Sequence, residues 1–402
     1  MTDVEKLLRD TLADPRHRLE PLPGMYEGVR ERARHRQQRI VQLASAVTVV
    51  VVIAGVATAV RLSTNSPREA QPTASLSASP PAHAQFNRVD IGAGSTGFLS
   101  VTPYVIFLAQ THPNGLIAVS PSDLSIAKQI ATPDAVDGTA VDRVAGLVWT
   151  WSSTQPADAS GDSAADSTSI HAYQTSTFAM DGAVTLPAYT FSAVALDGKL
   201  WLATSGGLYV VGTGSDGTKS ATKVVDGSVS SVAADAPRHR ILFGVFVETP
   251  TASSTTTDSN TIGIVAVHAV DAANHHVTTV GTPLPVGKES IAVVDGQVWV
   301  AGFGSDSLLI HLDAKTLRPI GAGASGLGKL DLGPGAIVWP GESVVWVRAG
   351  GSEALSCFDP KTGAVLEQWD TVQGPVASVV GRAYAASDGS LEQLSLAGGC
   401  KG

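Results

Sequence analysis

The feature that most constrains this chain is a short apolar segment with an aromatic centre, which recurs seven times. The central residues are Phe107, Trp149, Trp201, Phe243, Trp299, Trp346 and Tyr384. Phe107 and Tyr384 lie 277 residues apart, so the six intervals average about 46 residues. A polar turn follows three of the aromatics after 13 or 14 residues, opening at Ser120, Asp313 and Asp359, where the side chain can cap a type I turn. A repeat of this length, made of short strands and polar turns, is typical of a four-stranded propeller blade.

The sequence therefore predicts an all-β fold, a seven-bladed β-propeller over residues 86–402. The seventh repeat offers only three strands, at 378–380, 383–385 and 391–396. The segment Phe86–Ile91 precedes the first blade and has no other partner, so we expect it to supply the missing outer strand. Closure by this N-terminal strand removes the exposed edges that an open ring would present.

Two repeated motifs carry a resemblance to known propellers. Val-Trp-Val occurs at 298–300 and 345–347, and Asp-x-Lys-Thr at 313–316 and 359–362. These motifs resemble the repeats of YVTN-like and virginiamycin-B-lyase-like β-propellers over about 317 residues. The YVTN tetrapeptide is absent, and no position matches the catalytic histidine or metal ligands of the lyases. The resemblance thus implies blade architecture but no active site.

A second strong feature is the stretch 40–60, which holds 21 residues without a charge between Arg39 and Arg61. A helix of this length spans about 30 Å, the thickness of the hydrocarbon core of a bilayer. We predict a single transmembrane helix that inserts into the lipid bilayer as a signal anchor. Five arginines lie within residues 30–39 and few basic residues follow the stretch, so the N-terminus is expected in the cytoplasm and the C-terminal domain outside.

Cleavage is the alternative to anchoring. Ala57-Thr58-Ala59 has the small-x-small pattern of a signal-peptidase site, although the apolar stretch and the region before it are both long for a signal peptide. In either case the C-terminal part is exported.

Residues 1–39 are predicted to form a short helical cytoplasmic segment. Thr2 and Glu5 make a capping-box pattern, and Leu7, Leu8 and Leu12 fall on one helical face. This segment is either a basic platform on lipid phosphates or a docking peptide for a cytoplasmic protein.

The placement of this segment before one membrane helix resembles actinobacterial single-pass membrane proteins, some of which are anti-sigma factors. The arrangement alone is similar, because the His-x-x-x-Cys-x-x-Cys motif of zinc-binding anti-sigma domains is absent. Residues 61–85 are rich in Ser, Pro and Ala and are expected to be a linker.

Charge and cysteine content restrict the function further. The net charge is −9, and residues 1–39 carry nine basic against seven acidic groups, which leaves 18 against 29 for the rest. An acidic exported part argues against a nucleic-acid partner. The two cysteines, Cys357 and Cys400, fall in the predicted adjacent blades six and seven; a disulfide is permitted outside the cell, but spacing alone does not decide it.

No motif indicates a catalytic residue, a cofactor or a metal. Gly92, Gly94 and Gly97 fit a dinucleotide fingerprint, but strands follow where a helix is needed, and the same string recurs at 212–217 and 321–326, so we interpret these glycines as turns between blades. His275-His276 has no companion ligand nearby and is expected at a solvated hairpin tip. Asp158, Asp162 and Asp166 lack the alternating ligands and closing glutamate of a calcium loop.

Two insertions give the only indication of a functional face. Residues 152–169 and 249–261 are both predicted between the second and third strands of their blades, which places both loops on one side of the ring. We expect an extracytoplasmic module that binds or senses a ligand or protein. The alternatives are a propeller lyase or hydrolase with a central site, a transmembrane anti-sigma-type regulator, and a surface scaffold without a small ligand.

Overall fold

The computed structural model describes residues 88–92, 95–111, 113–154, 166–247, 264–284, 289–302, 308–320, 336–349, 354–370, 372, 374–387, 389–396 and 400. The predicted cytoplasmic segment (1–39), transmembrane helix (40–60) and linker (61–85) lie outside these residues. Across the described ranges, no helix is long and apolar enough to cross a membrane.

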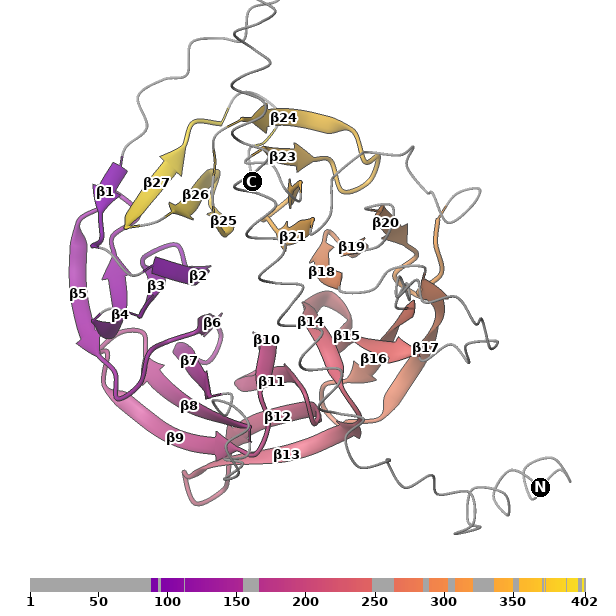
Figure 1. Cartoon of the computed structure of the whole chain (residues 1–402), viewed down its shortest axis with the longest axis horizontal. Coiled ribbons are helices and arrows are strands. Elements are labelled where there is room, and N and C mark those ends of the chain that lie inside the picture. The colour runs from indigo at the N-terminus through magenta and orange to yellow at the C-terminus, as the bar shows by residue number, and fades with distance from the viewer. Residues whose placement is uncertain are drawn as a thin grey trace, which may run out of the picture. The chain divides into compact units, whose positions relative to one another are not determined.

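The described residues form seven antiparallel sheets arranged around a common centre (Figure 1). Blade 1 contains β2 (Ser95–Val101), β3 (Ile106–Thr111), β4 (Asn114–Val119) and β5 (Ile126–Ala131). Blade 2 contains β6 (Gly138–Asp142), β7 (Leu147–Thr154), β8 (Ser167–Gln174) and β9 (Met180–Leu186). Blade 3 contains β10 (Thr190–Leu196), β11 (Lys199–Thr204), β12 (Gly207–Thr213) and β13 (Lys219–Asp226). Blade 4 contains β14 (Val229–Asp235), the 3₁₀ turn η2 (Ala236–Arg238), β15 (Arg240–Val247), β16 (Ile264–Asp271) and β17 (Val277–Leu284).

The remaining blades complete the ring. Blade 5 contains β18 (Glu289–Val294), β19 (Gln297–Gly302) and β20 (Leu308–Leu312). Blade 6 contains β21 (Ile337–Pro340), β22 (Val345–Arg348), β23 (Leu355–Phe358) and β24 (Val365–Trp369). Blade 7 contains β25 (Val376–Val379), β26 (Arg382–Ser387), β27 (Ser390–Leu394) and β1 (Arg88–Asp90). The first strand of each blade lies nearest the centre (Figure 1).

The ring closes as predicted. Strand β1 pairs antiparallel with β27, with Val89 opposite Leu391, so the N-terminal strand is the fourth strand of the last blade. A hydrophobic cluster that contains Tyr384 of blade 7 and Ile106 of blade 1 fills the gap between the last and the first blade. The all-β, seven-bladed propeller is thereby confirmed.

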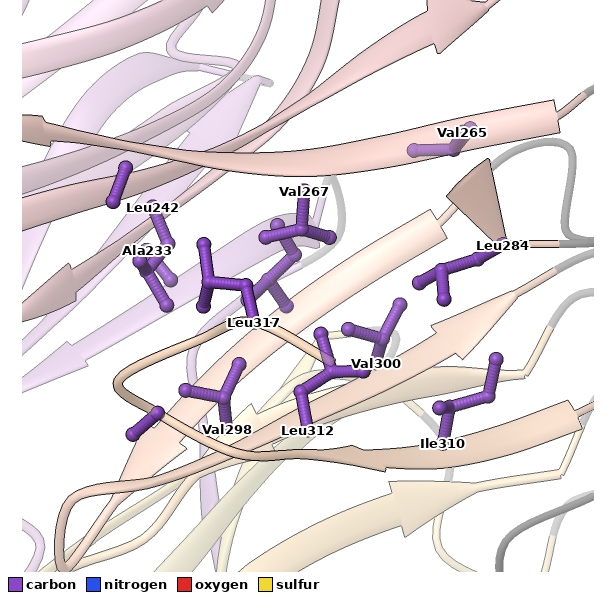
Figure 2. Packing of buried hydrophobic residues seen from close by; sticks show 13 residues of the cluster. Ala233, Leu242, Val265, Val267, Leu284, Val298, Val300, Ile310, Leu312 and Leu317 are labelled. Atoms are coloured by element: carbon purple, nitrogen blue, oxygen red, sulfur yellow. The ribbon is translucent and has the colours of Figure 1, made fainter. Parts of the chain in front are cut away.

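Apolar side chains pack between blades rather than within them. Among the described residues there is one buried cluster for each of the seven interblade gaps. Figure 2 shows the cluster between blades 4 and 5, where Val267 and Leu242 of blade 4 face Val298 and Leu312 of blade 5. Each blade has two buried faces, which explains why its strands are apolar over several consecutive residues.

The seven repeated aromatics are all buried. Most lie in the cluster shared with the following blade; Trp149, for example, packs with Leu200 and Leu202 of blade 3. Phe243 differs, because it lies in the cluster between blades 3 and 4, whereas its neighbour Leu242 packs toward blade 5. Successive side chains of a strand point to opposite faces, so the aromatic of blade 4 is one residue out of phase with the repeat.

The polar turns between third and fourth strands are one residue longer than the predicted type I turns. In five blades the fifth turn residue donates its N–H to the first carbonyl, as Leu317 does to Asp313 at 2.7 Å. That fifth residue has positive φ, at Leu124, Phe178, His275, Leu317 and Gly363. Capping by the first side chain occurs where Asp is present: Asp359 Oδ1 accepts from the N–H groups of Lys361 and Thr362. These bonds lower the pKa of the Asp359 carboxyl.

These turns contact the repeated aromatics of the preceding blade. Tyr384 donates its hydroxyl to the Pro121 carbonyl of blade 1 at 3.0 Å, and Trp299 Nε1 donates to the Pro360 carbonyl of blade 6 at 3.1 Å. His275 approaches Trp201 edge-on, with ring centroids 5.4 Å apart. The repeated aromatics and the polar turns of the sequence are therefore the two partners in one recurring contact between neighbouring blades.

Strand direction separates the propeller into two faces. The first-to-second and third-to-fourth turns lie on one side, called here the hairpin face, and β1 begins on that side at Arg88. The second-to-third connections and the links between blades lie on the other side, called the loop face. Both insertions fall on the loop face, between β7 and β8 and between β15 and β16. The first is shorter than predicted, because Ser152 and Ser169 still pair in the ladder.

Candidate functional site

The candidate site lies on the loop face where blades 2 and 3 meet. Asp137 immediately precedes β6, Asp166 precedes β8, and Tyr189 and Phe191 lie at the start of β10. These four residues are called the loop-face patch. Asp166 directly follows residues 155–165 in the sequence, the part of the first insertion that lies outside the described residues.

A network of hydroxyl groups fixes the link between the two blades. Thr168 Oγ1 donates to the Ala188 carbonyl at 2.7 Å and accepts from Thr190 Oγ1 at 3.0 Å. Ser153 Oγ lies 3.0 Å from the same Thr168 oxygen and accepts from the Thr190 N–H. Thr168 and Thr190 are buried, so these bonds satisfy polar atoms that would otherwise be costly to bury. The backbone that presents Tyr189 is thus held in place from both blades.

The carboxyl group of Asp137 is half-buried and has little compensation. Its Oδ2 accepts one backbone N–H, from Ser153 at 2.6 Å. Burial raises the pKa of Asp137, and this one bond only partly opposes the increase. Burial also raises the pKa of the Tyr189 phenol, with smaller contributions from the negative charges of Asp137 and Asp166. Both carboxylates therefore act electrostatically on the same phenol.

The aromatic part of the patch is presented by a β-bulge. The pairing of β10 with β11 shifts between Thr190 and Ser192, which leaves Phe191 outside the ladder. A bulge of this kind redirects a side chain. Phe191 is 38% exposed, and its ring centroid lies 5.5 Å from that of Tyr189. Blade 4 has the same shift between Val229 and Ser231, but there the extra residue is Ser230.

A further aromatic lies on the same face in blade 4. Phe246 is 41% exposed and stands one residue before the end of β15, next to the second insertion. Exposed phenyl rings on strands whose other large side chains are buried indicate a surface that contacts something else. Two exposed phenyl rings, Phe191 and Phe246, thus lie on the loop face.

The acidic groups of the patch are held by a backbone N–H group and a hydroxyl group. Among the described residues, neither Asp137 nor Asp166 pairs with a lysine or arginine. Asp166 Oδ2 accepts only the Ser205 hydroxyl, at 3.3 Å. By contrast, Asp235 on the hairpin face is buried against Arg240 at 2.8 Å and Arg238 at 3.2 Å. The patch therefore combines negative potential with accessible aromatic surface.

Blade 6 places a cation on the loop face. Arg348, the last residue of β22, lies over the Trp339 ring with its guanidinium carbon 5.5 Å from the centroid. Burial lowers the pKa of the Arg348 guanidinium. The loop face is therefore charged with opposite sign at blades 2–3 and at blade 6.

Sequence reasoning found part of this site. It placed the insertions on one face and singled out Asp166, but as a member of a rejected calcium loop whose other two residues lie outside the described part of the chain. It missed Asp137, Tyr189 and Phe191. The single signal was the pair of aromatics, Tyr189 and Phe191, at the start of an inner strand, where blade 4 carries Ser230.

Two other sequence interpretations need correction. Gly92 lies between β1 of blade 7 and β2 of blade 1, as predicted. Gly97 lies within β2 and Gly212 within β12, whereas Gly214 and Gly217 form the third-to-fourth turn inside blade 3, so these four glycines do not mark turns between blades. His275 is not a solvated tip: it packs on Trp201, and its Nε2 lies 3.3 Å from Lys199 Nζ. Burial, followed by the Lys199 charge, lowers the pKa of His275.

Cys357 and Cys400 are joined in a disulfide, with Cα atoms 6.2 Å apart. Cys357 lies in β23 of blade 6, and Cys400 follows β27, the third strand of blade 7. The disulfide therefore joins Cys400 to blade 6. Within the described ranges, no group of three or more His, Cys, Asp or Glu is arranged to hold a metal ion.

Comparison with known proteins supports the fold alone. The β-propeller domain of Cps50 (Swd1) from Myceliophteria thermophila is similar, with a TM-score of 0.55 at 8% identity over 77% of this chain and 99% of that one. Hydrazine synthase from Kuenenia stuttgartiensis gives a TM-score of 0.50 at 10% identity over 77% and 97%. BamB from Moraxella catarrhalis gives 0.46 at 14% identity over 77% and 100%. No protein-family profile matches the sequence. No curated protein matches it either.

Proposed function

We propose that this chain is a membrane-anchored extracytoplasmic propeller that binds a ligand or protein on its loop face. The observation that carries the proposal is the loop-face patch. It combines an exposed phenyl ring, presented by a β-bulge, with two carboxylates that have no lysine or arginine partner among the described residues. Exposed aromatic residues supply much of the binding energy in protein interfaces, and unpaired charges supply orientation. Propellers commonly serve as rigid binding modules.

The anchor and topology rest on the sequence. Residues 40–60 have the length and composition of a membrane helix, and the arginines before them favour a cytoplasmic N-terminus. The disulfide between Cys357 and Cys400 supports an oxidising compartment for the propeller, because such bonds are rare in the cytosol. In this arrangement residues 1–39 are available to a cytoplasmic protein, so that binding outside can be reported inside.

The binding proposal is tested with the full chain in its own membranes. Chemical cross-linking followed by mass spectrometry compares the wild type with a double variant, Asp137→Asn and Phe191→Ser. The matched control is Asp197→Asn with Ile126→Ser, which makes the same kind of change on the hairpin face and on the outer strand β5, where Ile126 is 40% exposed. We expect the patch variant alone to lose its cross-linked partner. Equal cross-linking by all three proteins would remove the loop-face patch from consideration.

Topology is tested separately by adding protease to intact cells. We expect the propeller to be digested or shaved from the outside after reduction of the disulfide, while an epitope placed before Thr2 stays protected. Protection of the C-terminal part would contradict the proposed orientation.

A further inference from the structure

The hairpin face carries an apolar surface of its own, at the tips of three consecutive blades. Tyr104 at the first hairpin of blade 1 is 83% exposed, Val144 at that of blade 2 is 90% exposed, and Val380 at that of blade 7 is 65% exposed. These three residues are called the apolar tips. In blades 3, 5 and 6 the corresponding positions are Asp197, Asp295 and Glu342. At the first hairpins the apolar residues therefore occupy three adjacent blades, although exposed apolar side chains also stand at the hairpin-face starts of outer strands, such as Val277 in blade 4 and Val365 in blade 6.

One of the apolar tips is held in a conformation that its residue type disfavours. Val380 has φ +49° at the first position of a two-residue turn with Gly381. Blades 3 and 5 use Asp197-Gly198 and Asp295-Gly296 in the same turn, also at positive φ, and Asp suits it well. A β-branched residue is strained there. An Asp-Gly turn, as in blades 3 and 5, would suit the fold better than Val380-Gly381 does. The exposed valine is therefore not explained by the needs of the fold.

Basic residues accompany the apolar tips. Arg143 precedes Val144, and Arg382 follows Val380-Gly381. Among the described residues, the Arg143 guanidinium donates to the Val101 carbonyl and that of Arg382 to the Pro121 carbonyl, and a guanidinium has five N–H donors in all. Arg143 and Arg382 thus flank two of the three apolar tips. The first hairpins of blades 3, 5 and 6 carry acidic side chains, one of which, Glu342, accepts the N–H of Val380.

The shape of this surface distinguishes between kinds of partner. Each apolar tip projects from a separate hairpin and is mostly exposed, so the three do not line a groove into which a protein segment could pack. A lipid interface accepts separate projecting groups, since acyl chains and headgroups rearrange around them. Tyrosine and arginine suit that interface: the phenol stays at headgroup level, and a guanidinium binds lipid phosphate.

The position of the chain entry agrees with such a partner. Strand β1 belongs to blade 7 and begins on the hairpin face at Arg88. Arg88 is the first described residue of the propeller. A tether that enters at this face raises the effective concentration of the apolar tips at a membrane, so weak individual contacts suffice.

We propose that Tyr104, Val144 and Val380, with Arg143 and Arg382, dock the hairpin face onto the headgroup layer of a lipid bilayer. The inference rests on the proposed membrane anchor and leaves the loop face directed away from the lipid. It does not depend on the identity of the loop-face ligand.

The test uses the full chain reconstituted in vesicles of phosphatidylcholine and phosphatidylglycerol. A nitroxide is attached at Val144→Cys and, in a matched protein, at Asp197→Cys on the polar side of the same face. Electron paramagnetic resonance then compares the accessibility of each label to oxygen and to a water-soluble nickel complex. We expect the Val144 label to be protected from nickel and accessible to oxygen, and the Asp197 label to show the reverse. Equal exposure of both labels to nickel would overturn the proposal, as would protection of Val144 that appears only when a second protein is added.

A second variant separates docking from folding. Val380→Asn installs the Asn-Gly pair that this turn favours, so the fold is kept while one apolar tip becomes polar. With the label at Val144, we expect the ratio of docked to undocked propeller to fall on the order of tenfold. An unchanged ratio would overturn the proposal. Retention of the protein in vesicles after alkaline washing is measured alongside: loss from the vesicles means that the anchor itself fails, whereas retention with a nickel-exposed Val144 label means that only the docking fails.

Discussion

Buried and half-buried carboxylates on the two faces of this propeller have different hydrogen-bond and ion-pair partners. On the hairpin face, Asp235 is buried between two arginines, and Asp142 accepts the backbone N–H groups of Val144 and Ala145 and that of Gly198 in the next blade. On the loop face, Asp137 is half-buried with one backbone partner. The carboxylates of Asp235 and Asp142 stabilise the contacts between strands and between blades. The carboxyl of Asp137 accepts one backbone N–H, so it can accept further hydrogen bonds from a ligand. The buried carboxylates that join neighbouring strands and blades therefore lie at the opposite ends of the strands from the proposed ligand-binding patch.

The largest effect is expected where a buried pair is broken on the hairpin face. Asp235→Ala leaves Arg240 buried without its carboxylate, which should lower the free energy of unfolding by about 3–5 kcal/mol. Urea denaturation of the full chain measures this. The exposed pair of Asp197 with His239 serves as a control, since removing it should change stability by less than about 1 kcal/mol. Equal effects at both sites would mean that burial does not distinguish them.

A smaller effect of opposite sign is expected at Val380. Because Asn tolerates positive φ and Val does not, Val380→Asn should raise the free energy of unfolding by about 1 kcal/mol. Thermal unfolding monitored by circular dichroism is sufficient. A lower melting temperature would show that Val380 contributes to packing and is not retained for an external contact.

A pH-dependent effect is expected at Asp137. Since burial raises the pKa of the folded carboxyl, its stabilising contribution is present below the unfolded pKa and is lost as pH rises through the folded pKa. The wild type should therefore lose stability relative to Asp137→Asn as the pH rises above the range in which an ordinary aspartate titrates. Parallel denaturation curves across this range give the difference. A constant difference would indicate that Asp137 is not perturbed.

The smallest effect on stability is expected at Phe191. Phe191→Ser reproduces the bulge residue of blade 4, so the free energy of unfolding should change by no more than about 0.5 kcal/mol while partner binding is lost. Denaturation and cross-linking on the same preparation separate the two. A large loss of stability would assign Phe191 to the core and weaken the comparison between the faces.

Much of the fold could be predicted because it repeats. The spacing of Trp149, Trp201, Trp299 and Trp346 reports a contact that each blade makes with the next, and the capped turns at Asp313 and Asp359 report the same contact from the other side. The repeat misled at Phe243, because a shift of one residue reverses the direction of a strand side chain, and spacing does not reveal direction.

The site could be predicted only as a face. The insertions indicate a side of the ring, but Asp137, Asp166 and Tyr189 come from three different strand ends. Only the link between blades 2 and 3 brings them together. The distinguishing properties of the site are the half-burial of the Asp137 carboxyl and the exposure of Phe191, and both depend on tertiary structure without a local sequence pattern. The apolar tips are similar: a valine before a glycine is ordinary until the turn gives it positive φ and leaves it exposed.

The most direct test of the two-face account is one photo-crosslinking experiment in living cells. A benzophenone amino acid is placed at Phe191 in one protein and at Val144 in another. The account predicts a discrete protein or ligand adduct from position 191 and a lipid adduct from position 144. Lipid adducts from position 191, or a protein adduct from position 144 with none from 191, would contradict it.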